Sequence, residues 1–349
     1  MTNTADLLAD PFGETAPTQK SLCLQVLGAS CLFESDSGEL LRLVAEAYAG
    51  LPAHRLAETI PQLRIKLVVN SSSVRNRRAE PPAVSMLSGL GFLGGTTLDS
   101  SWVMLSPRTR TALVVVSPRM LRFAYHVRYE YIEFAVFTLA ARVQRLVPLH
   151  AACVGHAGQG VLLMGPSGTG KSTVALHGLL HGLEFIAEDA VFVTADRLQA
   201  TGIANYLHVT DDSLHWLERP RERAAIRRSP TIRRRSGVEK FEVNLRRPRY
   251  RLAQSPLKIA AVVFLSSAPA GDGPLLRRLS RKDMLSSLNS LQAYAAGQPR
   301  WHAFARNLSR LEAFELRRGS HPREAVGALR ELLGAEAVAL ESVRACASR

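Results

Sequence analysis

The sequence of 349 residues contains only four cysteines, and none forms a CxxC pair or stands with histidines at zinc-ligand spacing. This argues against a zinc site or a disulfide framework and predicts free thiols in a reducing compartment, the cytoplasm. No run of about 18 apolar residues occurs, so no membrane span is expected. The first residues lack the basic and apolar regions of a signal peptide, and residues 1–20 are expected to form a disordered tail.

Aromatic residues (6%) and acidic residues are also scarce, since 30 Asp and Glu stand against 44 Lys and Arg, giving a net charge of +14. Such a protein favours anionic partners: nucleotides, phosphorylated or acidic peptides, or nucleic acid. The segment 219–251 alone holds 13 Lys and Arg against three acids. Only Phe241 and Tyr250 are aromatic there. Because base stacking needs aromatic platforms, nucleic acid is the less favoured partner.

The length and the 46% content of hydrophobic residues indicate about two domains with a true core. Residues 21–117 are predicted to form a small α+β domain. Its run LRIKLVV places Leu63, Ile65 and Leu67 on one face, as in a half-buried strand. Residues 118–349 alternate apolar strands with helical patterns, which predicts an α/β domain on a mixed sheet.

The strongest pattern is GPSGTGKS, which matches the phosphate-loop signature GxxxxGK[ST] at every fixed position. An apolar strand precedes it and a helical pattern follows. Glycines let successive N–H groups turn toward phosphates, and the lysine binds the β and γ oxygens. The pattern predicts ATP binding, with Mg²⁺ on the serine hydroxyl. The expected nucleotide-binding residues are Gly165, Pro166, Ser167, Gly168, Thr169, Gly170, Lys171, Ser172 and Thr173.

Two adjacent acids, Glu188 and Asp189, interrupt the apolar run FIAEDAVFV, which is predicted to be one buried strand. Burying both is unfavourable unless a metal ion offsets the charge. In a strand the two carboxylates face opposite ways, so one suits the metal and the other a base; a solvent-exposed strand end is the open alternative. Taken alone, His150 indicates a structural histidine and Lys240 a solvated charge.

The region His150–Val193 resembles the catalytic core of the HPr kinase/phosphorylase family. That family carries a histidine, a strand-turn-strand, a GxSGxGKS loop, a helix and an A-D-D-x-V strand, and here the order reads HAACVGHAGQGVLLMGPSGTGKSTVALHGLLHGLEFIAEDAVFV. The resemblance implies a P-loop, PEP-carboxykinase-like mixed sheet. It also implies that His150 is catalytic, that Glu188 replaces the family's base Asp, and that Asp189 is a metal ligand. The family's long signature after this region is not recognisable here.

The resemblance further implies an ATP-dependent kinase that phosphorylates a serine of a peptide or small protein, as HPr-kinase-related kinases of lasso-peptide precursors do, and a homo-oligomer. Three alternatives stay open: a kinase of a small hydroxylated metabolite, a nucleic-acid-binding ATPase, and a non-catalytic nucleotide-binding partner. The expected catalytic residues are His150, Lys171, Glu188, Asp189 and Lys240. The expected Mg²⁺ ligands are Ser172, Asp189 and Glu188.

Overall fold

The computed structural model describes residues 20–70, 81–98 and 100–334. The tail expected at residues 1–20 lies outside them, apart from Lys20. The chain divides into two compact units, each assembled from separate segments. The first comprises Met1–Leu24, Ala29–Ala49 and Pro61–Leu139, and the second comprises Gln25–Gly28, Gly50–Ile60 and Ala140–Arg349. The boundary expected after residue 117 therefore falls inside the first unit.

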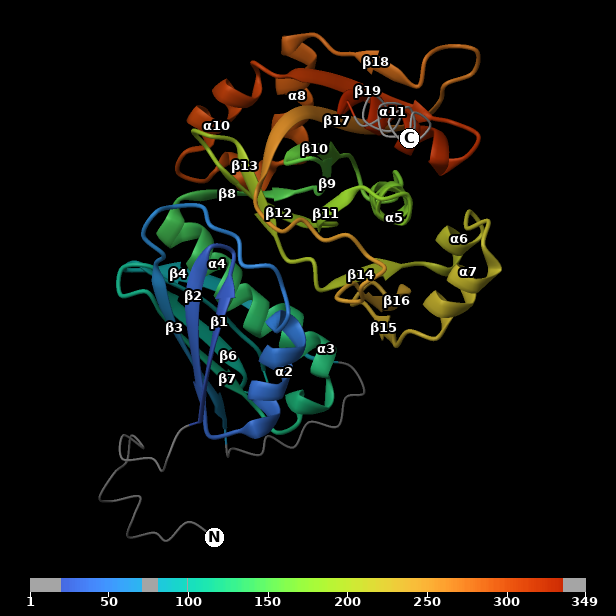
Figure 1. The fold of residues 1–349 in the computed structure, drawn as a ribbon. Coiled ribbons are helices and arrows are strands. Elements are labelled where there is room, and N and C mark those ends of the chain that lie inside the picture. The colour runs from blue at the N-terminus through green and yellow to red at the C-terminus, as the bar shows by residue number, and fades with distance from the viewer. Residues whose placement is uncertain (1–19, 71–80, 99, 335–349) are drawn as a thin grey trace, which may run out of the picture. The chain divides into compact units, whose positions relative to one another are not determined.

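A seven-stranded sheet dominates the first unit, with the strand order β1-β2-β3-β7-β6-β5-β4 (Figure 1). The strands are β1 (Lys20–Val26), β2 (Ala29–Ser35), β3 (Gln62–Val69), β4 (Ser85–Gly89), β5 (Phe92–Thr96), β6 (Trp102–Ser106) and β7 (Thr111–Val116). The predicted alternation along β3 is confirmed, because Leu63, Ile65 and Leu67 are all buried.

The helices of the first unit follow apolar spacing. Helix α2 buries Leu40, Leu43 and Val44, which recur at intervals of three and one along one face. The segment 127–144 begins as a π-helical turn and continues as an α-helix that ends before the next strand. The elements are α2 (Gly38–Tyr48), η1 (Met120–Arg122), α3 (Ala124–His126), η2 (Val127–Ile132) and α4 (Glu133–Gln144).

The second unit is built on a nine-stranded mixed sheet in the order β11-β9-β10-β17-β13-β12-β8, with β19 beside β17 and β18 beside β19. The pairs β10–β17 and β17–β19 are parallel, and the other pairs are antiparallel. The expected mixed α/β fold is therefore confirmed. The strands are β8 (Leu146–His150), β9 (Ala152–His156), β10 (Gln159–Met164), β11 (Glu184–Ala187), β12 (Ala190–Thr194), β13 (Gln199–Gly202), β17 (Leu257–Pro269), β18 (Leu276–Arg278) and β19 (Glu312–Arg318).

The described part of this unit also contains a separate three-stranded sheet, in the order β14-β16-β15, and seven helices. Ser280 caps the start of α8, where its Oγ accepts a hydrogen bond of 3.1 Å from the Asp283 N–H. The strands are β14 (Tyr206–Val209), β15 (Thr231–Arg233) and β16 (Glu239–Asn244). The helices are α5 (Lys171–Leu180), α6 (Asp211–Leu214), α7 (Pro220–Arg227), α8 (Arg281–Leu291), α9 (Ala293–Ala296), α10 (Trp301–Leu308) and α11 (Pro322–Leu332).

Strand β10 is buried on both faces, which explains its uninterrupted apolar sequence. Val161 and Leu163 pack with side chains of α5 and α11. Leu162 and Met164 pack on the opposite face with side chains of α8 and α10. This double cover fixes the strand from which the phosphate loop leaves. None of the helices in the described part of the chain is long and apolar enough to cross a membrane.

The run FIAEDAVFV is not one strand, contrary to the prediction. Its first half is β11, which pairs with β9, and its second half is β12, which pairs with β8 and β13. Glu188 and Asp189 form a bend between the two. Two adjacent carboxylates are unfavourable inside a sheet ladder, and the bend turns them out of the ladder.

One buried histidine gives this unit a pH-dependent stability. His177 on α5 is 2% exposed, and within the described residues neither ring nitrogen has a hydrogen-bond partner. Burial, with smaller contributions from His321 and His181, lowers the pKa of His177 to about 4 from 6.5. Because the unfolded chain takes up the proton first, stability falls as the pH drops from about 6.5 toward 4.

We predict that His177→Leu reduces the loss of thermal stability between pH 7 and pH 5, because leucine fills the site without a titrating group. The measurement is the melting temperature by circular dichroism at both pH values. His302→Leu, a change at an exposed histidine of α10, is the control and should keep the wild-type pH dependence. A His177→Leu variant that lost as much stability as wild type on acidification would contradict this account.

Candidate functional site

The phosphate loop connects β10 to α5 in the second unit, as the sequence predicts. Gly168 and Gly170 have φ values of 85° and 96°, a region that side chains disfavour, and Gly170 is the residue that caps α5. Both glycines are thus required by the turn itself. The apex of the loop, from Pro166 to Gly168, is exposed.

Lys171 folds back over this loop. Its Nζ donates to the carbonyl oxygens of Gly165 (2.7 Å) and Pro166 (3.1 Å), and the residue is 8% exposed. Thr169 Oγ1 donates to the same Pro166 oxygen at 2.8 Å. Burial lowers the pKa of the Lys171 ammonium, although the negative charge of Asp189 opposes the shift. The loop therefore holds a poorly solvated cation at its centre.

The residues after the lysine lie in the first turn of α5. Ser172 is half-buried there. Thr173 Oγ1 is 3.1 Å from Ser213 Oγ of α6, which ties the start of α5 to the segment after β14. The N-terminus of a helix of this kind favours anions through its free N–H groups.

His150 and Asp189 lie side by side at the ends of paired strands. His150 is the last residue of β8 and its register partner is Ala190, the first residue of β12. His150 Nδ1 is 2.9 Å from Asp189 Oδ1, and the side chains are 54% and 49% exposed. Partial burial raises the pKa of Asp189, but the hydrogen bond and charge of His150, with Arg234 and Lys171, outweigh it and lower the pKa to about 2. Asp189 is therefore an anion at neutral pH.

Gln292, at the C-terminal end of α8, fixes the backbone of His150. Its Oε1 accepts from the His150 N–H at 2.8 Å, and its Nε2 donates to the His150 carbonyl at 2.9 Å. Gln292 is 3% exposed, and both bonds are partly buried. A side chain thus continues the strand pairing at the point where the candidate catalytic histidine stands.

Glu188 points to different partners from those of Asp189. Its Oε1 accepts from the His208 N–H (3.0 Å) and lies 2.9 Å from His208 Nδ1. Glu242 Oε1 of β16 is 3.5 Å from the other ring nitrogen, Nε2. Burial lowers the pKa of His208, but the hydrogen bonds to the two glutamates more than compensate and the pKa is raised. The buried ring therefore favours the imidazolium form between two carboxylates.

Lys240, expected alone to be a solvated charge, is half-buried on β16 beside the acidic pair. Burial and the nearby Arg234 lower the pKa of Lys240, whereas Glu188 and Asp189 raise it. Arg234 itself lies 3.9 Å from Asp189 Oδ2. The sequence-predicted residues His150, Lys171, Glu188, Asp189 and Lys240 thus act on one another electrostatically in one region of the second unit.

Four further residues belong to this region and were not singled out from the sequence: Arg234, His208, Glu242 and Gln292. Arg234 and Glu242 stand within the basic stretch, whose charge alone did not distinguish them. His208 and Gln292 contact residues 20 and 142 positions away, respectively. A pattern of neighbouring residues in the sequence cannot predict contacts over such separations.

The donor set is compatible with magnesium. No group of three or more His, Cys, Asp and Glu side chains with metal-binding geometry occurs among the residues described. Magnesium usually takes only one or two protein carboxylates and completes its shell with water and phosphate oxygens. Glu188 Oε2 is buried and has no hydrogen-bond partner within the described chain. An orphaned carboxylate oxygen of this kind fits a metal ligand.

Comparison with solved structures finds weak similarity in fold. No protein-family model and no curated protein matches the chain. Among solved structures, the chain is similar to the Hpr(Ser) kinase/phosphatase from Coxiella burnetii, with 14% sequence identity and a TM-score of 0.26 over 58% of this chain and 96% of that chain.

We predict that Gln292→Ala destabilises the protein by about 1–3 kcal/mol, because it removes two part-buried hydrogen bonds, to the N–H and to the carbonyl of His150. Urea unfolding followed by circular dichroism measures the change. Gln298→Ala removes one bond of 3.2 Å to the Tyr294 carbonyl at an exposed position, and it should change stability by less than about 0.5 kcal/mol. Equal effects of the two variants would show that Gln292 does not fix His150.

Proposed function

We propose that this protein is a kinase that binds ATP with Mg²⁺ and transfers the γ-phosphate to a hydroxyl group. The proposal is carried by a complete phosphate-loop pattern whose Lys171 interacts electrostatically with Asp189, and by the hydrogen bond of 2.9 Å between Asp189 and His150. Phosphoryl transfer needs positioning and charge neutralisation, and these residues offer both next to a proton acceptor.

The loop would hold the nucleotide through its backbone. The N–H groups of residues 168–171 would donate to the β-phosphate, and the Lys171 ammonium would leave the Gly165 and Pro166 carbonyls for phosphate oxygens. Ser172, Glu188 and Asp189 are the side chains that would hold Mg²⁺, which neutralises charge on the β- and γ-phosphates. The orphaned Glu188 Oε2 favours Glu188 as a metal ligand.

His150 is the group best suited to take the acceptor's proton. Because Asp189 is ionised, His150 Nδ1 must carry the hydrogen that joins them. No hydrogen bond from residues 20–70, 81–98 or 100–334 reaches Nε2. Nε2 would accept the proton as the acceptor oxygen bonds to the γ-phosphorus and the bond to ADP breaks, while Asp189 stabilises the imidazolium. Glu188, engaged by His208, is less suited to this role.

The acceptor is proposed to be a serine of a peptide or small protein. His150 and Asp189 are about half exposed, so a hydroxyl on a chain lying across the surface can reach them. Arg234 and Lys240 add positive charge beside the pair, which favours an acceptor with acidic neighbours. A homo-oligomer stays a prediction from the resemblance.

We predict that Lys171→Ala abolishes both ATP binding and transfer, because it removes the cation that binds the β and γ oxygens. Isothermal titration measures binding, and intact-mass analysis of serine peptides with acidic flanks, incubated with ATP and Mg²⁺, measures transfer as a gain of one phosphate. Lys282→Ala, at an exposed position of α8, is the control. Transfer of the γ-phosphate by the Lys171→Ala variant would contradict the proposed function.

His150→Gln is predicted to separate chemistry from binding. The amide cannot accept the proton as imidazole does, so kcat should fall by about 10²–10⁴, while the Kd for ATP changes by no more than about twofold. Steady-state kinetics and isothermal titration on the same preparation check both values. A normal kcat in this variant would show that His150 does not accept the proton, and it would not contradict the proposed nucleotide site.

A further inference from the structure

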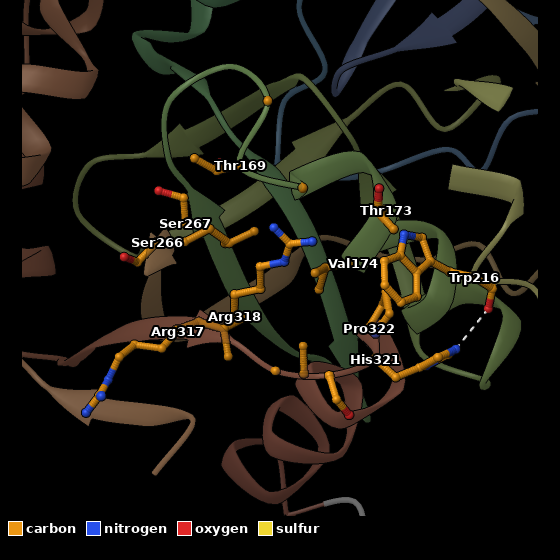
Figure 2. A pocket seen from close by; sticks show the side chains of 17 residues that line it. Thr169, Thr173, Val174, Trp216, Ser266, Ser267, Arg317, Arg318, His321 and Pro322 are labelled. Carbon is orange, nitrogen blue, oxygen red and sulfur yellow. Dashed lines mark hydrogen bonds between the residues drawn. The ribbon is translucent and has the colours of Figure 1, made fainter. Parts of the chain in front are cut away.

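A pocket opens directly beside the phosphate loop in the second unit, with a volume of about 270 Å³. Gly168, Thr169 and Gly170 of the loop and Thr173 of α5 form one wall. Further lining comes from Trp216, after α6, whose ring lies beside Thr173, and from the segment that leads from the end of β19 into α11 (Figure 2). The pocket is thus continuous with the loop that would hold the phosphates.

The candidate catalytic pair does not belong to this pocket. Neither His150 nor Asp189 lines it, and no carboxylate occurs among its described lining residues. Its lining instead includes Arg318 and His321. A triphosphate has two ends, and if the γ end meets His150 and Asp189, the nucleoside end must leave the loop elsewhere. This pocket shares Gly168, Thr169 and Gly170 with the loop and has no carboxylate in its described lining that would repel the α-phosphate.

Trp216 is held in place by His321. His321 caps the N-terminus of α11, where its Nδ1 accepts from the Arg323 N–H at 3.1 Å. The other nitrogen, Nε2, therefore carries the hydrogen and donates to the Trp216 carbonyl at 3.1 Å. The two rings meet edge to face at 84°, with centroids 5.6 Å apart. The indole is half-buried and pre-oriented at the pocket wall.

Arg317 and Arg318 are consecutive residues of β19, and their side chains point in opposite directions. Figure 2 shows the Arg318 guanidinium reaching into the pocket toward the side of Thr173, whereas Arg317 points away. Arg317 Nη1 donates to the Ala270 carbonyl at 3.4 Å, outside the pocket. Alternation along the strand thus presents one arginine to the ligand and ties the other to the fold.

We propose that this pocket binds the nucleoside of the triphosphate, with the Trp216 indole against the base and Arg318 on the ribose or α-phosphate oxygens. The proposal rests on the proposed function, since it requires a nucleotide in the loop. The pocket is slightly smaller than the roughly 300–1,000 Å³ of pockets for drug-sized ligands, which suits one base and its sugar. An aromatic face binds a base by stacking, and an arginine binds the anionic tail.

The test compares ATP with inorganic tripolyphosphate, which offers the loop the same phosphate chain without a nucleoside. Isothermal titration with Mg²⁺ gives both Kd values. Trp216→Ala should weaken ATP binding by about tenfold or more and change tripolyphosphate binding by less than twofold. Trp216→Phe, which keeps an aromatic face, should restore most of the ATP affinity. Tyr294→Ala, which removes an exposed aromatic ring on α9, is the control and should bind both ligands as wild type does.

A second pair of variants tests the arginine. Arg318→Ala should raise the Kd for ATP about tenfold, whereas Arg317→Ala should leave it within twofold. An equal loss of ATP and tripolyphosphate affinity in Trp216→Ala would overturn the proposal, because the loop itself would then have been damaged. Unchanged ATP affinity in that variant would overturn it as well.

The results also separate this proposal from the proposed function. If the wild-type protein binds ATP and tripolyphosphate equally, the nucleoside pocket is wrong and the phosphate loop stands. If it binds neither ligand, both proposals fail together. If Trp216→Ala changes the KM of the peptide acceptor and not the Kd of ATP, the pocket serves the acceptor, and the assignment to the nucleoside is overturned.

Discussion

The burial of one ammonium group inside a turn of its own backbone is the constraint on which the site depends. Lys171 cannot leave the carbonyls of Gly165 and Pro166 at no cost, because it is poorly solvated and its charge needs oxygen partners. The glycine conformations before it create the turn, and the doubly covered strand β10 holds the turn still. In the proposed function, phosphate oxygens would take the place of those carbonyl oxygens as partners of the ammonium group. Asp189 interacts electrostatically with the same ammonium group.

The acidic bend makes that arrangement possible by giving its two carboxylates different environments. Asp189 faces the half-exposed His150, and its pKa is held near 2 by positive neighbours after burial has opposed the shift. Glu188 turns inward to His208, whose other ring nitrogen faces Glu242. Had the run stayed one strand, alternation alone would have separated the acids. The bend separates them and also releases both from the ladder.

Features that depend on residues close together in the sequence were predictable, and features that depend on residues far apart in the sequence were not. The order β10, loop, α5 is local, and so are the helix cap at Ser280 and the alternation in β3; all were predictable and are present. The break between β11 and β12 was missed, because each half pairs with a different, distant strand. Partners of the site such as Gln292, and the pocket wall at Trp216, come from segments that only the tertiary fold brings to the loop.

The partners of the charged and aromatic side chains in the basic segment 219–251 indicate which ligands that segment can bind. Arg234 and Lys240 influence the acidic pair, while Arg227 and Arg251 are paired with Asp211 and Glu184. Its two aromatic rings are engaged too: Tyr250 lies under the Arg249 guanidinium at 4.6 Å, and Phe241 packs against the core. Bases of single-stranded nucleic acid would find no open ring there to stack on, within the residues described. The positive charge therefore favours an acidic acceptor at the catalytic pair over a nucleic acid.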